Sequence, residues 1–392
     1  MKVVFICHAR DDFMSAGTGF DIAIVGAGIG GLAAASALLK AGHNVHVYEQ
    51  AQAFARVGAG IQQGPNAVKV LRKLGLEPRL RELAFRPNSS LNRQWDTGEV
   101  TWERELGQFV EDEYGAPYLY MHRGDLHAAL ASTVPVDRIH HGAHFVRFES
   151  EERGVALHFA DGRCVKADLA IGADGIHSVV RRQLFGDEQV RFTGRVAYRT
   201  TFAADRLGGI ELDSSCKWWG ADRHIVIYYV NPRRSEVYFV TSTPEPEFAV
   251  ESWSEVGDLD ALRSAYADFH PRVQAILEAC PAAHKWALVE RAPMPRWRGD
   301  RVTLLGDACH PMTPYMAQGA ATAVEDGAVL SRALEGVDHS DINSALDIYE
   351  SARKPRTARI QQISRLNDMD KIRAEIESVY SYDAWNVPLP SA

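Results

Sequence analysis

The first residues whose types and spacing indicate chemistry form a glycine-rich turn near the start of the chain. Gly26, Gly28 and Gly31 make a G-x-G-x-x-G pattern, which follows the short apolar run 21–25 and precedes an Ala- and Leu-rich segment. In a strand–turn–helix unit these glycines allow a tight turn, the close approach of a pyrophosphate and close packing of the helix on its strand. A second apolar run ends in Glu49, whose carboxylate can accept hydrogen bonds from a ribose diol. The pattern predicts a dinucleotide site, but it does not distinguish FAD from NAD.

Two later segments, 168–178 and 301–311, are each predicted to be a strand that runs into a Gly/Asp turn. In the second segment, Asp307 could accept a hydrogen bond from a ribityl hydroxyl. The segment 320–334 is predicted to be a helix, whose N-terminus would direct a positive dipole end toward the group that Asp307 holds. A reduced flavin carries negative charge near its pyrimidine edge, so this arrangement favours FAD. Taken alone, each segment could be an ordinary strand-to-turn Asp-Gly, but three such segments in this order indicate a flavin site.

A proton-handling pair is predicted on the strand 223–229. Side chains alternate between the two faces of a strand, so His224 and Tyr228 share one face, with about 7 Å between neighbours two positions apart. An imidazole and a phenol on a sheet that covers a flavin could handle the proton of a ring hydroxyl. The alternative is that both are packed and hydrogen-bonded in the sheet core. By the same alternation, Lys217 and Trp219 share a face and could line the same pocket.

Composition narrows the class of protein. The 392 residues include 43 Lys and Arg against 51 Asp and Glu, a formal net charge of −8, which gives no electrostatic reason to bind nucleic acid or an anionic membrane. The apolar start 3–7 is too short for a secretory signal, and residues 1–20 are expected to be a poorly ordered extension, with a short strand at 3–7 as the alternative. Five widely spaced cysteines indicate neither a disulfide framework nor a zinc site, so we expect a reduced, cytoplasmic protein without a metal.

The three glycine- and aspartate-containing segments, in this order and spacing, resemble the single-component FAD-dependent aromatic hydroxylases, the para-hydroxybenzoate and salicylate hydroxylase family. The resemblance runs from about residue 21 to residue 356. It includes His122–Leu126, whose arginine contacts the flavin in that family, and Gly58–Ile61, which lies beside the isoalloxazine ring in relatives. The resemblance implies FAD contacts at Gly26, Gly28, Gly30, Gly31, Glu49, Gln50, Arg123, Phe145, Asp174, Asp307, Gly319 and Ala320.

The resemblance also implies an α/β fold, in which a Rossmann-like FAD-binding domain carries an inserted antiparallel-sheet substrate domain and C-terminal helices. The expected segments are 20–90, 115–190 and 285–355 for the FAD-binding domain, 91–114 and 191–284 for the substrate domain, and 356–392 for a helical tail. Residues 193–243 independently predict antiparallel strands, because they lack helical periodicity and are rich in Tyr, Trp, Val and Thr. The Arg- and Lys-rich stretch 353–365 is expected to be a solvated helical face.

A reaction follows from the resemblance. NADH or NADPH would reduce the bound FAD, O2 would be activated on it, and one oxygen atom would enter a hydroxylated aromatic carboxylate after its ring hydroxyl loses a proton. No second G-x-G-x-x-G unit is found, which fits a reductant that docks transiently and leaves NADH and NADPH as alternatives. The expected catalytic residues are His224 and Tyr228, and the expected pocket residues are Gln62, Lys217, Trp219 and Met312. The enzyme would be a monomer or a homodimer.

Within the family, the resemblance is strongest to hydroxylases that act on 6-hydroxynicotinate and release carbon dioxide, giving 2,5-dihydroxypyridine. One position departs from that group: Gln62 stands where those hydroxylases have a histidine. Because a glutamine cannot titrate, either His224 and Tyr228 carry the proton transfer or the substrate is a related ring such as salicylate or a hydroxybenzoate. A flavoprotein reductase that inserts no oxygen and a flavin-binding sensor are further alternatives. His310 could be a base or could stabilise its turn.

Overall fold

The computed structural model describes residues 19–391 except 57–58, 189 and 248–255. Almost all of the extension expected over residues 1–20, including the alternative strand at 3–7, lies outside the described residues. Within the described ranges, no helix combines the length and the apolar character that crossing a bilayer requires.

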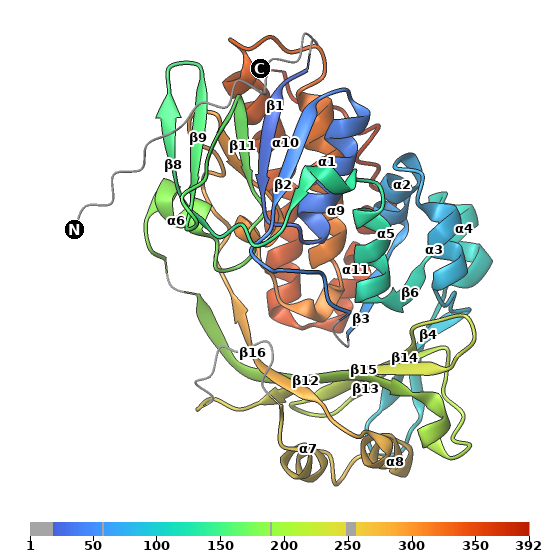
Figure 1. Cartoon of the computed structure of the whole chain (residues 1–392). Coiled ribbons are helices and arrows are strands. Elements are labelled where there is room, and N and C mark those ends of the chain that lie inside the picture. The colour runs from blue at the N-terminus through green and yellow to red at the C-terminus, as the bar shows by residue number, and fades with distance from the viewer. Residues whose placement is uncertain (1–18, 57–58, 189, 248–255, 392) are drawn as a thin grey trace.

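A five-stranded parallel sheet forms one half of the molecule (Figure 1). Its order is β17 (Val302–Leu304), β11 (Leu169–Gly172), β1 (Asp21–Val25), β2 (Asn44–Tyr48) and β7 (Ile139–His140). β1 is buried along almost its whole length, as expected for a strand covered on both faces. The carboxyl ends of parallel strands meet at one edge, so the turns after β1, β2, β11 and β17 converge there.

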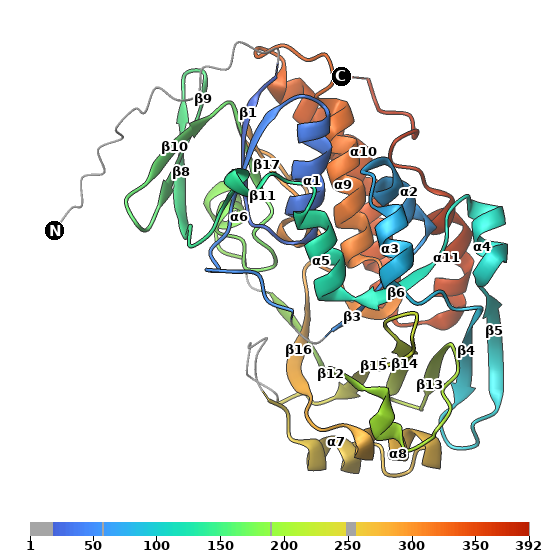
Figure 2. The same cartoon turned by 45° about the vertical axis from the view of Figure 1, so that its right-hand side comes forward.

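Helices cover one face of this sheet, and a small antiparallel sheet covers the other (Figures 1 and 2). The helices are α1 (Ile29–Lys40), α5 (Arg123–Ala131), α9 (Gly319–Ala333) and α10 (Ile342–Leu366). The small sheet has the order β10 (Cys164–Ala167), β9 (Gly154–Phe159) and β8 (Phe145–Glu151). α1 and α9 approach closely because Gly327 has no side chain: a Cβ there would lie 2.8 Å from the backbone nitrogen of Ala34.

A seven-stranded sheet forms the other half of the molecule. Its order is β16 (His284–Glu290), β12 (Arg191–Ala203), β15 (Glu236–Pro244), β14 (His224–Tyr229), β13 (Ser215–Trp219), β4 (Ser89–Gln94) and β5 (Val100–Glu105). All neighbours are antiparallel except β13 and β4, which are parallel. Helices α7 (Leu259–Ala265) and α8 (Pro271–Ala279) cover the outer face, and the inner face is turned toward the rest of the chain (Figures 1 and 2).

The remaining elements connect and cover these sheets. Between the helices and the large sheet lies a two-stranded antiparallel ribbon of β3 (Gly60–Gln63) and β6 (Leu119–His122) (Figure 2). The other helices are α2 (Pro65–Lys73), α3 (Glu77–Leu83), α4 (Gly107–Tyr114), α6 (Val179–Phe185) and α11 (Met369–Ser381). Short 3-10 helices are η1 (Val136–Arg138), η2 (Ala204–Leu207), η3 (Gly306–Ala308) and η4 (Pro314–Met316).

The expected α/β class, with a Rossmann-like part and a separate antiparallel sheet, is confirmed. The exact domain boundaries stay a prediction; β16, from the segment 285–355 that the sequence assigned to the FAD-binding part, pairs in the large sheet. The solvated face expected over 353–365 is wrong at Arg353, which is fully buried and pairs with two carboxylates. The prediction that the cysteines are reduced is likewise wrong at Cys164, which is disulfide-bonded. Cys216, Cys280 and Cys309 are free.

Candidate active site

The glycine turn after β1 has the geometry of a phosphate cradle. Gly26 has a φ of +105°, and a Cβ at Gly31 would overlap the carbonyl oxygen of Gly26, so both positions require glycine. A Cβ at Gly28, by contrast, would meet no atom of the described residues within 4 Å. The backbone at the N-terminus of α1 therefore faces open space, where the free N–H groups and the positive end of the helix can meet a pyrophosphate. Gly30 differs, since a Cβ there would come within 2.7 Å of Leu305 Cδ2, which makes it a packing glycine.

Glu49 lies beside this turn, at the end of β2. Its two carboxylate oxygens accept hydrogen bonds from the backbone N–H groups of Ala27 and Ala51, each at 2.8 Å. These bonds fix the carboxylate next to the phosphate cradle and leave further lone pairs for a ribose diol. Gln50 follows as an exposed side chain at the same edge. The two residues are thus in position for the adenosine end of FAD.

Asp174 and Phe145 have local roles that the sequence did not indicate. The Asp174 carboxylate accepts hydrogen bonds from the Ser178 hydroxyl and from the N–H groups of Val179 and Val180, at 2.6, 2.7 and 3.1 Å, so it caps α6. Phe145 begins β8 and packs edge-on against Phe159, with ring centres 6.1 Å apart. A role for either in holding FAD stays a prediction. Asp174 would act by fixing the shape of its turn, because its carboxylate is occupied by the N-terminus of α6.

Arg123, the first residue of α5, and Asp307, in η3, are opposite charges that act on each other. Both residues are exposed, and yet both lose hydration in the folded protein. Loss of hydration raises the pKa of Asp307 and lowers the pKa of Arg123, while the charge of each opposes the shift of the other. A side chain that is accessible and still poorly hydrated indicates a concave surface. Asp307 sits in η3, directly after Gly306, which has a φ of +62°.

The N-terminus of α9 completes this side of the site. Gly319 and Ala320 begin the helix, and no side chain in the described part of the chain caps it, so its first N–H groups are available to a ligand. Met312 lies 3.8 Å from a Cβ built at Gly319 and also packs against the core of the large sheet. Met312 therefore lies at the junction between the expected flavin site and the expected substrate face.

The register of the large sheet places the predicted catalytic side chains on one face. His224 pairs with Trp219 and Ser242 on the neighbouring strands, and Tyr228 pairs with Ser215 and Tyr238. Between them, Val226 pairs with Lys217 on one side and Val240 on the other. The face is the inner one, because Tyr228 contacts Tyr120 of β6 and the side chain of Gln62 of β3.

His224 is buried among aromatic rings and cations. Its ring centre is 4.7 Å from that of Trp219 and 5.5 Å from that of Tyr315. Burial lowers the pKa of His224 well below its usual value, and the charges of Lys217 and Arg195 lower it further. The imidazole is therefore neutral at neutral pH, with a lone pair that can accept a proton. An anionic ligand nearby would oppose the two cations and strengthen it as a base.

Tyr228 and Gln62 belong to a hydrogen-bonded chain. Tyr228 shares a hydrogen bond with the side chain of Gln62, whose Oε1 accepts a second bond from the Tyr118 hydroxyl at 2.7 Å. Burial raises the pKa of both phenols well above the usual value, so both stay protonated. Tyr228 can thus donate to or orient a ring oxygen, but it is not a phenolate at neutral pH.

Lys217 is a cation for which the described residues provide no counterion. Its Nζ lies 3.8 Å from the centre of the Trp219 ring, and loss of hydration lowers its pKa to about 7. Among the residues that the structure describes, no carboxylate pairs with it. A poorly hydrated ammonium on the wall of a pocket is stabilised by an anion, so Lys217 is suited to hold a carboxylate.

Sequence reasoning missed several residues of this face. Arg199 of β12 lies over the ring of Trp286, 3.5 Å from its centre, and burial lowers its pKa to about 10. The Tyr315 hydroxyl lies 3.0 Å from Ser242 Oγ, so the loop before α9 reaches the sheet. The strand alternation that predicted Lys217 could have predicted Arg199, but nothing local indicates that Tyr315 reaches His224.

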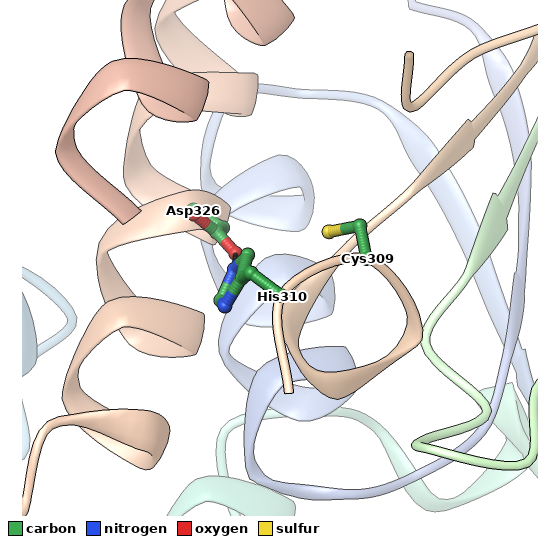
Figure 3. A group of neighbouring side chains, drawn as sticks. All are labelled: Cys309, His310 and Asp326. Atoms are coloured by element: carbon green, nitrogen blue, oxygen red, sulfur yellow. Dashed lines mark hydrogen bonds and ion pairs between the residues drawn. The ribbon is translucent and has the colours of Figure 1, made fainter. Parts of the chain in front are cut away.

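His310 follows η3, and its side chain is directed at α9. It is fully buried, and its Nε2 is 2.6 Å from Asp326 Oδ2 on α9, as Figure 3 shows. Cys309 is close enough that a sulfur, an imidazole nitrogen and a carboxylate oxygen lie within 4.8 Å of one another. The same carboxylate also pairs with Arg353 at 2.7 Å, and burial raises the pKa of the Cys309 thiol. Because Asp326 already pairs with Arg353 and the Cys309 thiol is protonated, these groups form an ion-pair network and not a metal centre. The contact with Asp326 gives His310 the turn-stabilising role.

Comparison with known proteins agrees with this geometry. The FAD binding domain family model matches residues 19–364. The chain is 42% identical over 371 residues to 6-hydroxynicotinate 3-monooxygenase of Pseudomonas fluorescens, covering 94% of this chain and 96% of the relative. It is 36% identical over 343 residues to 3-hydroxybenzoate 6-hydroxylase of Klebsiella oxytoca, covering 86% and 85%.

Similarity in structure is equally extensive. The crystal structure of Klebsiella pneumoniae HpxO complexed with FAD and uric acid superposes with a TM-score of 0.80 at 27% identity, covering 95% of each chain. The family predicted from the sequence and the predicted FAD cofactor are thereby confirmed. The family model spans most of the chain and the relatives align over nearly their whole length, so this chain belongs to the FAD binding domain family and is an FAD-dependent aromatic monooxygenase.

Proposed function

We propose that the enzyme hydroxylates 6-hydroxynicotinate with loss of its carboxylate, forming 2,5-dihydroxypyridine at the expense of NAD(P)H and O2. The observation that carries the proposal is the inner face of the large sheet, which presents a neutral imidazole, a neutral phenol and an ammonium that no carboxylate of the described residues pairs with. The 42% identity to a 6-hydroxynicotinate 3-monooxygenase supports this choice of ring.

The floor of the pocket matches an aromatic carboxylate. The register aligns Lys217, Val226, Val240 and Arg199 in one row across four strands. Two valines thus form an apolar floor, and a cation lies at each end, about 14 Å apart at the usual strand spacing. A flat ring can lie over the valines while its carboxylate meets Lys217. A neutral ring would leave that ammonium without a partner, so the row favours an anionic substrate.

Each side chain has a task in this scheme. Bound FAD supplies the electrons taken from NAD(P)H and activates the oxygen. Gln62 and Tyr228 orient the ring hydroxyl, and a ring nitrogen of His224 takes its proton. The deprotonated hydroxyl raises electron density at the carbon para to it, which bears the carboxylate in 6-hydroxynicotinate. One atom of O2 bonds to that carbon and the other is released as water; the carbon–carboxylate bond breaks, its electron pair stays with the ring, and carbon dioxide leaves.

The remaining parts of the proposal follow from the same layout. FAD would be held by segments 20–90, 115–190 and 285–355, and the substrate by segments 91–114 and 191–284. The nicotinamide reductant would dock transiently, as in an enzyme with a single glycine fingerprint. We place the enzyme in the cytoplasm, where NAD(P)H is supplied, as a monomer or homodimer.

A second candidate is the hydroxylation of a benzene ring such as salicylate or 3-hydroxybenzoate. Gln62 favours it, because an amide beside Tyr228 can orient a phenol oxygen and does not depend on a ring nitrogen. The 36% identity to a 3-hydroxybenzoate 6-hydroxylase shows that this chemistry occurs among relatives.

The test is NADH and NADPH oxidation by the FAD-loaded enzyme with 6-hydroxynicotinate, salicylate, 3-hydroxybenzoate and 4-hydroxybenzoate, with products identified by mass spectrometry. A decarboxylated, hydroxylated product from 6-hydroxynicotinate supports the first proposal. Turnover confined to a benzene ring supports the second. Oxidation of NAD(P)H without incorporation of oxygen into any of these rings would contradict both.

A further inference from the structure

Two adjacent acids on α9 form a buried ionic network beneath the active site. Glu325 and Asp326 are both fully buried, and two arginines of α10 neutralise them. Arg353 bonds to Asp326 and Glu325, each at 2.7 Å, and Arg356 bonds to Glu325 at 2.8 Å. None of these four residues is part of the chemistry described above. A buried ion network seldom stabilises a fold more than apolar side chains of the same volume would. We therefore looked for a function in the contacts that the two acids make.

Asp326 holds both ends of the turn that carries Asp307. Its Oδ2 accepts a hydrogen bond from the backbone N–H of Gly306 at 3.0 Å and lies 2.6 Å from His310 Nε2 (Figure 3). Gly306 and His310 flank Asp307, which remains exposed at the tip of the turn. One carboxylate on α9 thus binds both ends of the turn that carries Asp307, in addition to the hydrogen bonds that the N–H groups of Cys309 and His310 donate to the Gly306 carbonyl.

Glu325 holds the segment that follows β3. The Asn66 amide donates to Glu325 Oε1 at 2.7 Å and to Gln318 Oε1 at 2.9 Å. Gln318 directly precedes the free N-terminus of α9, and Asn66 lies at the start of α2, four residues after Gln62. Glu325 thereby ties the strand of Gln62 to the helix end that faces the flavin site.

We propose that Glu325 and Asp326 are positioning residues that set Asp307, the α9 N-terminus and Gln62 in register around the reactive end of FAD. Neighbouring residues on a helix point about 100° apart, so an adjacent pair of acids can reach two different loops from one rigid helix. The arginines of α10 hold the two carboxylates in place, because each oxygen has a fixed partner. The proposal depends on FAD binding and not on the identity of the aromatic substrate.

The decisive variants change the contact with the Asp307 turn. His310→Ala removes the partner of Asp326 at the far end of the turn, whereas His310→Gln keeps a donor there. Asp326→Asn keeps the size of the side chain and an oxygen that can accept from the Gly306 N–H, but it removes the negative charge. Glu77→Gln is the matched control: Glu77 is a buried acid between Arg72 and Arg81 in a different part of the fold.

Each purified variant is titrated as apoprotein with FAD, and the visible spectrum and midpoint potential of the bound flavin are recorded together with the apoprotein Tm. We expect His310→Ala and Asp326→Asn to raise the Kd for FAD by about tenfold or more and to shift the spectrum and potential of the bound flavin. His310→Gln should stay close to the unmodified enzyme, and Glu77→Gln should lower Tm without changing the Kd for FAD.

If the variants only lowered the stability of the fold, Tm would fall without a specific change in FAD affinity or in the flavin spectrum. Unchanged FAD affinity and an unchanged flavin spectrum in His310→Ala would overturn the proposal, as would an equal loss of affinity in Glu77→Gln. If Asp326→Asn does not fold, the comparison of His310→Ala with His310→Gln decides the question by itself. Neither readout depends on catalytic turnover, so the outcome is independent of which ring the enzyme hydroxylates.

Discussion

Replacing Lys217 with methionine removes the one charge that we assign to the substrate carboxylate while keeping most of the side-chain volume. Nζ lies over Trp219, and its pKa is lowered to about 7 by loss of hydration. A hydrogen bond to a charged group contributes about 1.5–3 kcal/mol, which corresponds to a loss of affinity of roughly 10- to 100-fold. We expect this loss in KM for the aromatic acid, with a much smaller effect on the Kd for FAD.

The lowered pKa of Lys217 also predicts a pH dependence. A bound carboxylate raises the pKa of the ammonium again, so proton uptake is linked to binding above about pH 7. KM for the acid should therefore be flat below pH 7 and should rise by up to about tenfold per pH unit above it. The substrate carboxylate stays ionised throughout this range, so it does not contribute to the slope.

Steady-state kinetics between pH 6 and pH 9 measure this effect, with Lys217→Arg as the matched variant. Arginine stays charged across the range, so this variant should retain affinity but lose the rise in KM above pH 7. The same depressed pKa has a second consequence. The unfolded chain binds a proton at Lys217 more tightly than the folded chain does, so Lys217→Met should raise Tm at pH 6. An unchanged KM in Lys217→Met, or a pH-independent KM in the unmodified enzyme, would refute the reasoning.

Three further changes test the rest of the site. Tyr228→Phe removes the hydroxyl that orients the ring oxygen, and we expect ring hydroxylation in single-turnover assays to fall about 10- to 100-fold while the FAD content stays the same; unchanged product formation at saturating substrate would exclude this role. Asp307→Ala should weaken FAD binding by about 10- to 100-fold, which equilibrium titration of the apoprotein measures, and a variant that purifies with full flavin would contradict the placement of Asp307. Gly31→Ala puts a Cβ into the carbonyl oxygen of Gly26, so we expect loss of both FAD and thermal stability by absorbance and calorimetry, and normal flavin content would show that the turn can relax.

Local sequence patterns predicted those parts of the fold in which chemistry and backbone geometry coincide. The G-x-G-x-x-G turn is one such case, because a φ of +105° at Gly26 and the overlap that a Cβ at Gly31 would cause allow no other residue. The shared face of His224 and Tyr228 is another, since alternation along a strand is fixed by the pleat. Both predictions needed only residues adjacent in sequence.

Contacts between distant segments could not be predicted in this way. Arg353 lies in a basic stretch that resembles a solvated helix face, and only the packing of α10 on α9 brings it against Glu325 and Asp326. The pattern identifies Arg353 as a charged residue, but its partners come from a segment that the pattern does not contain.

The protonation states of the substrate face suggest how its residues divide the work. Burial makes both His224 and Tyr228 neutral, although it does so by lowering one pKa and raising the other. A neutral imidazole can accept a proton, whereas a neutral phenol can only donate or orient, so the two are not interchangeable as bases. The cation of Lys217 weakens His224 as a base until an anion arrives beside it. Binding of the carboxylate would therefore both anchor the ring and raise the basicity of the imidazole, which couples recognition of the acid to removal of its ring proton.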